Sequence, residues 1–175
     1  MKAQDFCIRP ARREDGAAIW RLVRESETLE LNSCYAYLLL ASHFADTCVV
    51  CVQSGDLLGA VLGYRLPQDP ATVFVWQIGV ARKARQRGIG KAMVHALLDA
   101  VRCQGVTHLE ATINPSNGAS DSLFRGIARD FATHCNVRDG FVGDDFGPMC
   151  DHEPERLYRI GPLDHAVRNQ GDESC

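Results

Sequence analysis

The sequence lacks an excess of charge of one sign and has no long apolar run. Its 175 residues carry 19 lysines and arginines against 22 aspartates and glutamates, a formal net charge of −3, so the basic surplus typical of nucleic-acid-binding proteins is missing. No stretch approaches the roughly 18 apolar residues of a membrane span, and the first residues contain no apolar signal-peptide segment. We therefore expect a cytoplasmic protein without nucleic-acid or membrane partners.

Paired metal-binding motifs are also missing, although the chain has eight cysteines and six histidines. Cys48 and Cys51 form the only C-x-x-C motif, in a β-prone run where residues three apart point to opposite faces of a strand. No two histidines have the spacing of a paired zinc signature. We expect reduced thiols and no bound metal.

Hydrophobic periodicity predicts one domain over residues 1–163 and a polar, disordered tail over 164–175. The first half reads as a short strand at 6–8, helices at 13–23 and 35–44, a hairpin of strands at 47–53 and 57–66, and a central strand at 72–80. The second half reads as a helix at 89–101, a strand at 106–113, a helix at 117–129, a loop at 138–149 and a last strand at 156–160. This order predicts an α/β fold with a mixed sheet, antiparallel at first and then continued by a strand–helix–strand crossover.

The most informative segment is Arg85-Gln-Arg-Gly-Ile-Gly-Lys91, between the central strand and a strongly periodic helix. Gly88 and Gly90 leave room for backbone N–H groups at the helix N-terminus to converge on an anion. Neither a P-loop nor a Rossmann pattern fits, because Arg85 and Met93 stand where those patterns need glycine. The segment predicts a phosphate site of another kind, with a plain glycine-rich turn as the alternative.

Arg85-x-x-Gly88-x-Gly90 resembles the Q/R-x-x-G-x-G/A signature of the GNAT N-acetyltransferases, and it follows a strand that ends in Gln77-Ile-Gly-Val80. The resemblance covers nearly the whole chain. It implies a largely antiparallel sheet with splayed central strands and flanking helices, and acetyl-CoA as cosubstrate. It also implies that the Val80 N–H meets the thioester oxygen. The residues expected to bind the cofactor are Ile78, Gly79, Val80, Arg85, Gln86, Arg87, Gly88, Ile89, Gly90, Lys91 and Asn117.

Four further segments, at 29–40, 75–80, 112–120 and 152–156, resemble the L-2,4-diaminobutyrate acetyltransferases of ectoine biosynthesis. This resemblance implies acetyl transfer from acetyl-CoA to the 4-amino group of the diamino acid. The alternatives are another small amine or a protein N-terminus as acceptor, or a non-catalytic acyl-CoA sensor. The residues that the resemblance places around the acceptor are Glu30, Asn32, Ser33, Tyr35, Trp76, His152 and Glu155. The alternatives to these binding roles are helix capping, core packing and a solvated position on the surface. Helix capping is also the alternative for Asn117.

The chemistry requires a base, because an alkyl amine is mostly protonated at neutral pH. Glu30, His152 or Glu155 is the expected proton acceptor, directly or through water. The departing thiolate needs a proton in turn. Many GNAT proteins carry a tyrosine for this step where Phe124 stands here, so Tyr35 and water remain the candidates for general acid.

Three consecutive leucines, Leu38 to Leu40, occupy more of a helix surface than one core-facing stripe needs. Together with the resemblance, this excess of apolar surface predicts a homodimer.

Overall fold

The computed structural model describes residues 6–26, 28–147 and 152–163, which form a seven-stranded sheet in the order β1-β2-β3-β4-β5-β7-β6. All neighbouring strands are antiparallel except β4 and β5, which confirms the predicted mixed sheet and crossover. The strands are β1 (Cys7–Pro10), β2 (Val49–Gln53), β3 (Asp56–Leu66), β4 (Asp69–Val80), β5 (His108–Ile113), β6 (His134–Asp139) and β7 (Arg156–Gly161). The helices are α1 (Gly16–Ser26), α2 (Cys34–His43), α3 (Ile89–Arg102), α4 (Gly118–Asp130) and α5 (Gly143–Phe146).

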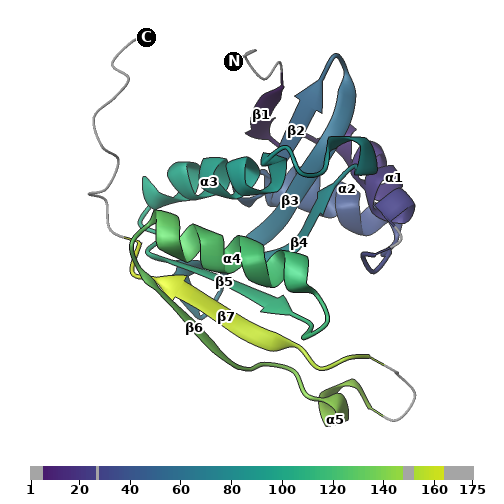
Figure 1. Ribbon diagram of the computed structural model, residues 1–175. Coiled ribbons are helices and arrows are strands. Elements are labelled where there is room, and N and C mark those ends of the chain that lie inside the picture. The colour runs from purple at the N-terminus through teal and green to yellow at the C-terminus, as the bar shows by residue number, and fades with distance from the viewer. Residues whose placement is uncertain (1–5, 27, 148–151, 164–175) are drawn as a thin grey trace.

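Helices cover both faces of the sheet and divide the core in two, with α3 and α4 on one face and α1 and α2 on the other (Figure 1). Cys51 is buried in the first cluster and Cys48 in the second, so the two thiols face opposite sides as predicted. Among the described residues, no helix is both long and apolar enough to cross a membrane, and no group of three potential metal ligands comes together.

Two tight hairpins connect β2, β3 and β4. Gln53 pairs with Asp56, so Ser54 and Gly55 form a two-residue turn with φ angles of 51° and 86°. The next turn places Leu66 opposite Asp69, so β4 begins before the predicted start of the strand at residue 72. Proline is typical of loops, so the sequence predicts a later start of the strand. Pro70 is the second residue of β4, next to the turn, where a strand tolerates proline.

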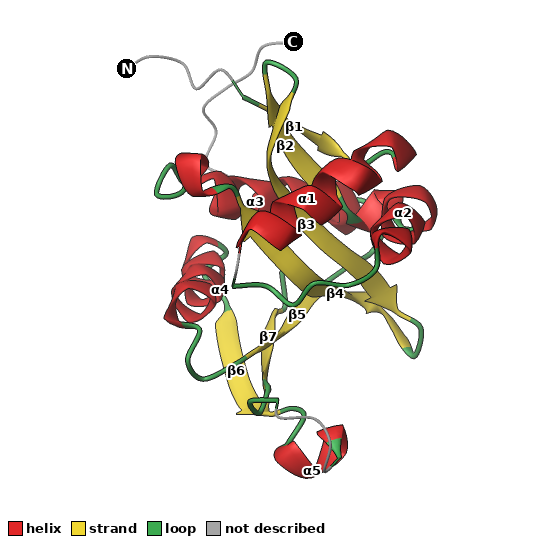
Figure 2. Cartoon of the chain, turned by 90° about the vertical axis from the view of Figure 1, so that its right-hand side faces the viewer, coloured by secondary structure: helices red, strands yellow, loops and turns green. Residues whose placement is uncertain are grey.

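The predicted loop over 138–149 is wrong at its start, because Arg138 and Asp139 belong to β6. This edge strand has only Cys135 and Val137 as apolar residues, so its alternation is weak in the sequence. The short helix α5 follows at the end of the β6–β7 arm (Figure 2), while Met149 and the predicted tail over 164–175 lie outside the described residues.

The central strand β4 separates from its neighbour β5 halfway along its length. Their parallel pairing ends at Val75 and Ala111, although β4 continues to Val80. On its other edge β4 has a β-bulge at the same height, because Leu62 and Gly63 pair with Gln77 and Val75 and leave Trp76 as an extra residue. The strands diverge from this level onward (Figure 1), which confirms the predicted splay.

Candidate active site

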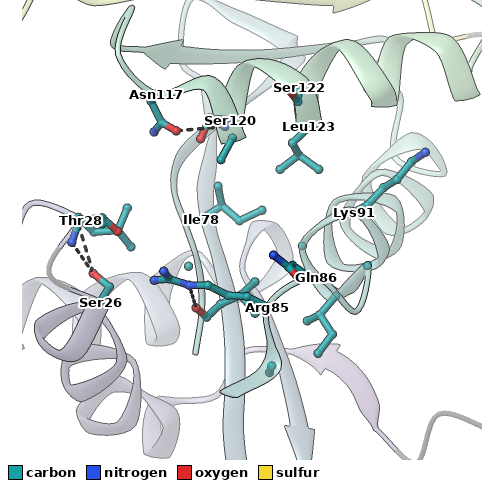
Figure 3. A pocket seen from close by; sticks show the side chains of 18 of the residues that line it. Ser26, Thr28, Ile78, Arg85, Gln86, Lys91, Asn117, Ser120, Ser122 and Leu123 are labelled. Carbon is teal, nitrogen blue, oxygen red and sulfur yellow. Dashed lines mark hydrogen bonds between the residues drawn. The ribbon is translucent and has the colours of Figure 1, made fainter. Parts of the chain in front are cut away.

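A cavity of about 940 Å³ lies where β4 and β5 separate (Figure 3). It is lined by the end of β4, the loop before α3 and the first turns of α3 and α4. Of the residues predicted to bind the cofactor, all line it except Arg87, whose guanidinium lies 6.0 Å from the Phe6 ring centre. The sequence did not indicate the remaining lining residues, which are Ser26, Thr28, Leu29, Ala84, Asn114, Ser116, Ala119, Ser120, Ser122 and Leu123.

The glycine loop has the backbone geometry of an anion site. Gly88 adopts φ 75° and ψ 3°, the left-handed region that glycine enters without steric cost, and α3 begins directly after it. No side chain caps this end of α3, and the N–H groups of a first helical turn have no partner within the helix. A Cβ atom on Gly90 would lie 3.7 Å from side-chain atoms of Ile78 and Val80, so Gly90 faces β4 across the cavity. A diphosphate fits at this position.

The end of β4 presents backbone groups toward the cavity. Ala81 N–H donates to Leu58 O at 2.8 Å. Hydrogen-bonded pairs alternate along an antiparallel ladder, so Ile78 and Val80 direct their N–H and C=O groups away from β3. Arg85 confirms this direction, because its Nε donates to Val80 O at 3.2 Å from the cavity side (Figure 3). An extended chain that carries amides can bind here as an added strand would.

Asn117 and Lys91 line the cavity and also have structural roles. The Asn117 side chain accepts a hydrogen bond from Ser120 N–H at 3.1 Å and so caps α4, as its structural alternative predicted. Lys91 Nζ lies 2.7 Å from Asp130 Oδ2, which also lies 2.7 Å from His95 Nε2. The Lys91 ammonium is therefore directed toward α4, and its contribution to the cavity comes from the backbone and the base of the side chain.

A second cavity, of about 460 Å³, is lined by earlier residues of the same two strands, β4 and β5. Trp76 and Thr112 line it, two residues before Ile78 and Asn114, which line the first cavity. The lining residues are Tyr64, Leu66, Phe74, Trp76, Glu110, Thr112, Arg138, Asp139, Gly140, Phe141, Phe146, His152, Glu155 and Leu157.

Glu155 is the most perturbed ionisable group of the second cavity. Its side chain is 15% exposed, and its buried Oε2 has no hydrogen-bond partner among the described residues. Burial raises the pKa of Glu155, and this effect outweighs the lowering by nearby His152, whose Nε2 lies 3.9 Å from Oε1. The His152 ring stacks on Phe146 at 4.3 Å between centroids. A partly desolvated carboxylate with a raised pKa is better suited than an exposed one to accept a proton from a bound ammonium group.

The predicted acceptor residues fall into two groups. Trp76, His152 and Glu155 line the second cavity, whereas the remaining four, Glu30, Asn32, Ser33 and Tyr35, line neither cavity. Ser33 caps α2 by accepting a hydrogen bond from Ala36 N–H, and Tyr35 is 67% exposed. Functional roles for these four residues stay predictions.

Two residues that the sequence did not single out hold the segment before α2 against β4. The buried Tyr37 hydroxyl accepts from Asn32 N–H and donates to Gln77 Oε1, both at 3.2 Å. Gln77 Nε2 in turn donates to Glu30 O at 2.7 Å. This closed network fixes the backbone of residues 30–32 beside the bulge. Because Gln77 lies 40 or more residues from Tyr37 and Glu30 in the sequence, only the fold reveals this network.

Phe124 does not face either cavity. It is 2% exposed and packs in the core under α4, while its neighbours Ser122 and Leu123 line the first cavity. Phe124 therefore supplies no proton donor to the cavity, and Tyr35 or water stays the predicted general acid.

Comparison with known proteins gives a consistent result. Residues 16–127 match the model of the Acetyltransferase (GNAT) family. The chain is 45% identical over 161 residues to the L-2,4-diaminobutyric acid acetyltransferase of Bordetella parapertussis, covering 91% of this chain and 86% of the relative. It is 41% identical over 163 residues to that of Halomonas elongata, covering 93% and 84%.

Among solved structures, the diaminobutyrate acetyltransferase EctA of Paenibacillus lautus, in complex with its substrate L-2,4-diaminobutyric acid and coenzyme A, is similar with a TM-score of 0.87 and 38% identity. That likeness covers 95% of this chain and 100% of the other. Ard1 of Thermoplasma volcanium, at 16% identity and a TM-score of 0.73, shares the fold, over 91% of this chain and 99% of its own. The chain belongs to the GNAT family of acetyltransferases, as the glycine loop after a splayed strand predicted.

Proposed function

We propose that this protein transfers the acetyl group of acetyl-CoA to the 4-amino group of L-2,4-diaminobutyrate, which gives N4-acetyl-L-2,4-diaminobutyrate in ectoine biosynthesis. The observation that carries the proposal is the second cavity, which is lined by Trp76 and Thr112 at the level where β4 and β5 separate and contains the mostly buried carboxylate of Glu155. The similarity to diaminobutyrate acetyltransferases over about nine-tenths of the chain supports the choice of substrate.

The first cavity fits acetyl-CoA, which supplies an activated acetyl group when bound. The first-turn amides after Gly88 hold the diphosphate, and the backbone of Ile78 and Val80 pairs with the amide-bearing arm. The Val80 N–H points into the split, where it donates a hydrogen bond to the thioester oxygen. By comparison with known oxyanion donors, such a contact lowers the barrier by about 3–4 kcal/mol.

The second cavity holds the amine. Trp76 provides an apolar wall beside the split, which excludes water from the reacting nitrogen. Glu155 accepts the proton that the ammonium must lose, because burial raises the pKa of Glu155 above that of an ordinary carboxyl group. His152, 3.9 Å away, favours the carboxylate form of Glu155.

The proposal includes three broader statements. Residues 1–163 act as one catalytic domain, the enzyme works in the cytoplasm, and it is a homodimer. Support for the dimer comes from apolar surface around α2: Leu38, Leu39 and Leu40 are each only partly buried, and Leu31 and Phe44 are each 45% exposed.

The test is a thiol-release assay with acetyl-CoA and four acceptors: L-2,4-diaminobutyrate, L-lysine, spermidine and a short peptide. The expected result is the highest kcat/KM for diaminobutyrate, with NMR of the product placing the acetyl group on N4. A preference for spermidine or the peptide overturns the substrate assignment. Calorimetric binding of acetyl-CoA without turnover of any acceptor indicates a sensor instead.

A further inference from the structure

The second cavity contains one cation that the proposed reaction does not use. Its charged lining residues are Glu110, Arg138, Asp139, His152 and Glu155. Glu110 is already engaged, because its Oε1 lies 2.6 Å from Arg159 Nη1. Arg138 is the only lysine or arginine among the described lining residues, and it forms no ion pair within the described part of the chain.

The position of Arg138 follows from strand register. On β6, Cys135 and Val137 pack against the core under α4, so Arg138 lies on the opposite face. Arg138 is paired with Leu157 of β7, and Leu157 is paired with Thr112 of β5. These three residues therefore form one row across the floor of the second cavity.

The row extends from the level where β4 separates from β5 to the edge strand β6. Thr112 stands at the inner end, beside the level where β4 leaves β5, and Arg138 stands two strands away. With strands about 4.8 Å apart, the two backbones are about 10 Å from each other. A long guanidinium side chain and a short amino acid in extended form together bridge that gap, with the reacting amine at the split.

We propose that Arg138 binds the carboxylate of the acceptor and so selects diamino acids over diamines. The inference rests on the proposed function for the reaction at the other end of the substrate. An exposed guanidinium at the outer end of the row forms two parallel hydrogen bonds with a carboxylate, a geometry that a lysine ammonium does not reproduce. Glu155 precedes Leu157 of this row by two residues and lines the same cavity, so its carboxylate attracts an ammonium group of the substrate and repels the substrate carboxylate.

The experiment is a cycle of two enzymes and two acceptors. Wild type and Arg138→Gln are assayed with L-2,4-diaminobutyrate and with L-2,4-diaminobutyramide, which keeps both amines and loses only the negative charge. The amide is measured as a substrate and as a competitive inhibitor of diaminobutyrate acetylation. We expect Arg138→Gln to lower kcat/KM for diaminobutyrate about tenfold to a hundredfold, mainly through KM, and to change the amide less than threefold. Arg138→Lys should recover part of the loss.

Arg156→Gln is the matched control, because Arg156 is an exposed arginine on the adjacent strand that does not line the cavity. It should leave both acceptors unchanged. An equal loss for both acceptors in Arg138→Gln, or no loss for either, overturns the inference. If the wild type acetylates neither acceptor, the proposed function fails instead, so the two failures are distinguishable.

Discussion

Gly88 and Gly90 stand two residues apart in the loop, yet the structure predicts opposite effects of an added methyl group on stability. At Gly88 a Cβ atom meets nothing within 4 Å, but φ is 75°. The left-handed conformation costs an alanine about 1–2 kcal/mol relative to glycine. The lower entropy of the unfolded chain offsets about 0.4–1 kcal/mol of this. Gly88→Ala should therefore lose about 1 kcal/mol, which lowers Tm by about 2–4 °C in a chain of this size.

Gly90 lies inside α3, and a Cβ atom there makes ordinary contacts at 3.7 Å with Ile78 and Val80. Gly90→Ala should leave Tm unchanged or raise it by a few degrees, because alanine favours the helix. The glycine-loop signature accepts either glycine or alanine at this position, so Gly90→Ala should also bind acetyl-CoA with the wild-type Kd. A valine is larger and extends beside the first-turn amides. Displacing one charge-assisted hydrogen bond to the diphosphate costs about 1.5–3 kcal/mol, so Gly90→Val should raise the Kd for acetyl-CoA about tenfold to a hundredfold.

Differential scanning calorimetry and isothermal titration calorimetry measure the two effects separately. Gly126→Ala is the control, since Gly126 lies inside α4, leaves a Cβ 3.7 Å from the flexible Arg129 side chain and does not line the cavity. It should match Gly90→Ala in Tm and the wild type in Kd. The double variant Gly88→Val with Gly90→Val should bind no acetyl-CoA while unfolding cooperatively. Wild-type affinity in the double valine variant would refute the placement of the diphosphate at α3.

Three further predictions follow from contacts in the second cavity and around α2. Glu155→Gln should lower kcat about 10²- to 10⁴-fold and remove the acidic limb of the pH–rate profile, which in the wild type lies above the usual carboxyl range because burial raises the pKa of Glu155. A raised folded-state pKa also means that stability falls as pH rises through that range, so Glu155→Gln should unfold at a higher temperature than the wild type at pH 8 and at the same temperature at pH 4. Tyr37→Phe should lose about 1 kcal/mol in urea unfolding, because it removes two hydrogen bonds of a buried hydroxyl, while Tyr35→Phe, on an exposed ring, should lose nothing; equal values would contradict the network. Light scattering at micromolar concentration should give twice the 19.3 kDa chain mass, and a fully active monomer would show that the subunit interface is not needed.

The sequence predicts the parts of this protein that depend on local patterns. The strong apolar period of residues 89–101 and the glycines before it identify α3 and its anion site, because both signals lie within one short segment. The Ser33 and Asn117 caps are predicted for the same reason. Edge strand β6 has only two apolar residues in alternation, so the same reasoning assigns its last residues to a loop.

The acceptor site is harder to predict because its residues meet only across the sheet. Arg138, Leu157 and Thr112 share a row through register, and no local pattern specifies register between strands so far apart in the chain. The Tyr37–Gln77 network has the same character. The resemblance of segment 29–40 predicts Tyr35 at the acceptor site. In the helix, Tyr37 points toward the core and Tyr35 is exposed.

Trp76 is an extra residue in β4 relative to β3, so the separation of β4 from β5 depends on the number of residues in β4. Leu62 and Gly63 are consecutive and pair with Gln77 and Val75, so deletion of Trp76 would leave a regular ladder with unchanged partners on both sides. Bulges bend a strand and increase its twist, and the deletion would remove that bend. A substitution at this position changes a wall of the second cavity, but a single-residue deletion would let β4 run on beside β5 and close the space between them. A single-residue deletion in β4 should therefore impair acetyl transfer more than a substitution of Trp76 does.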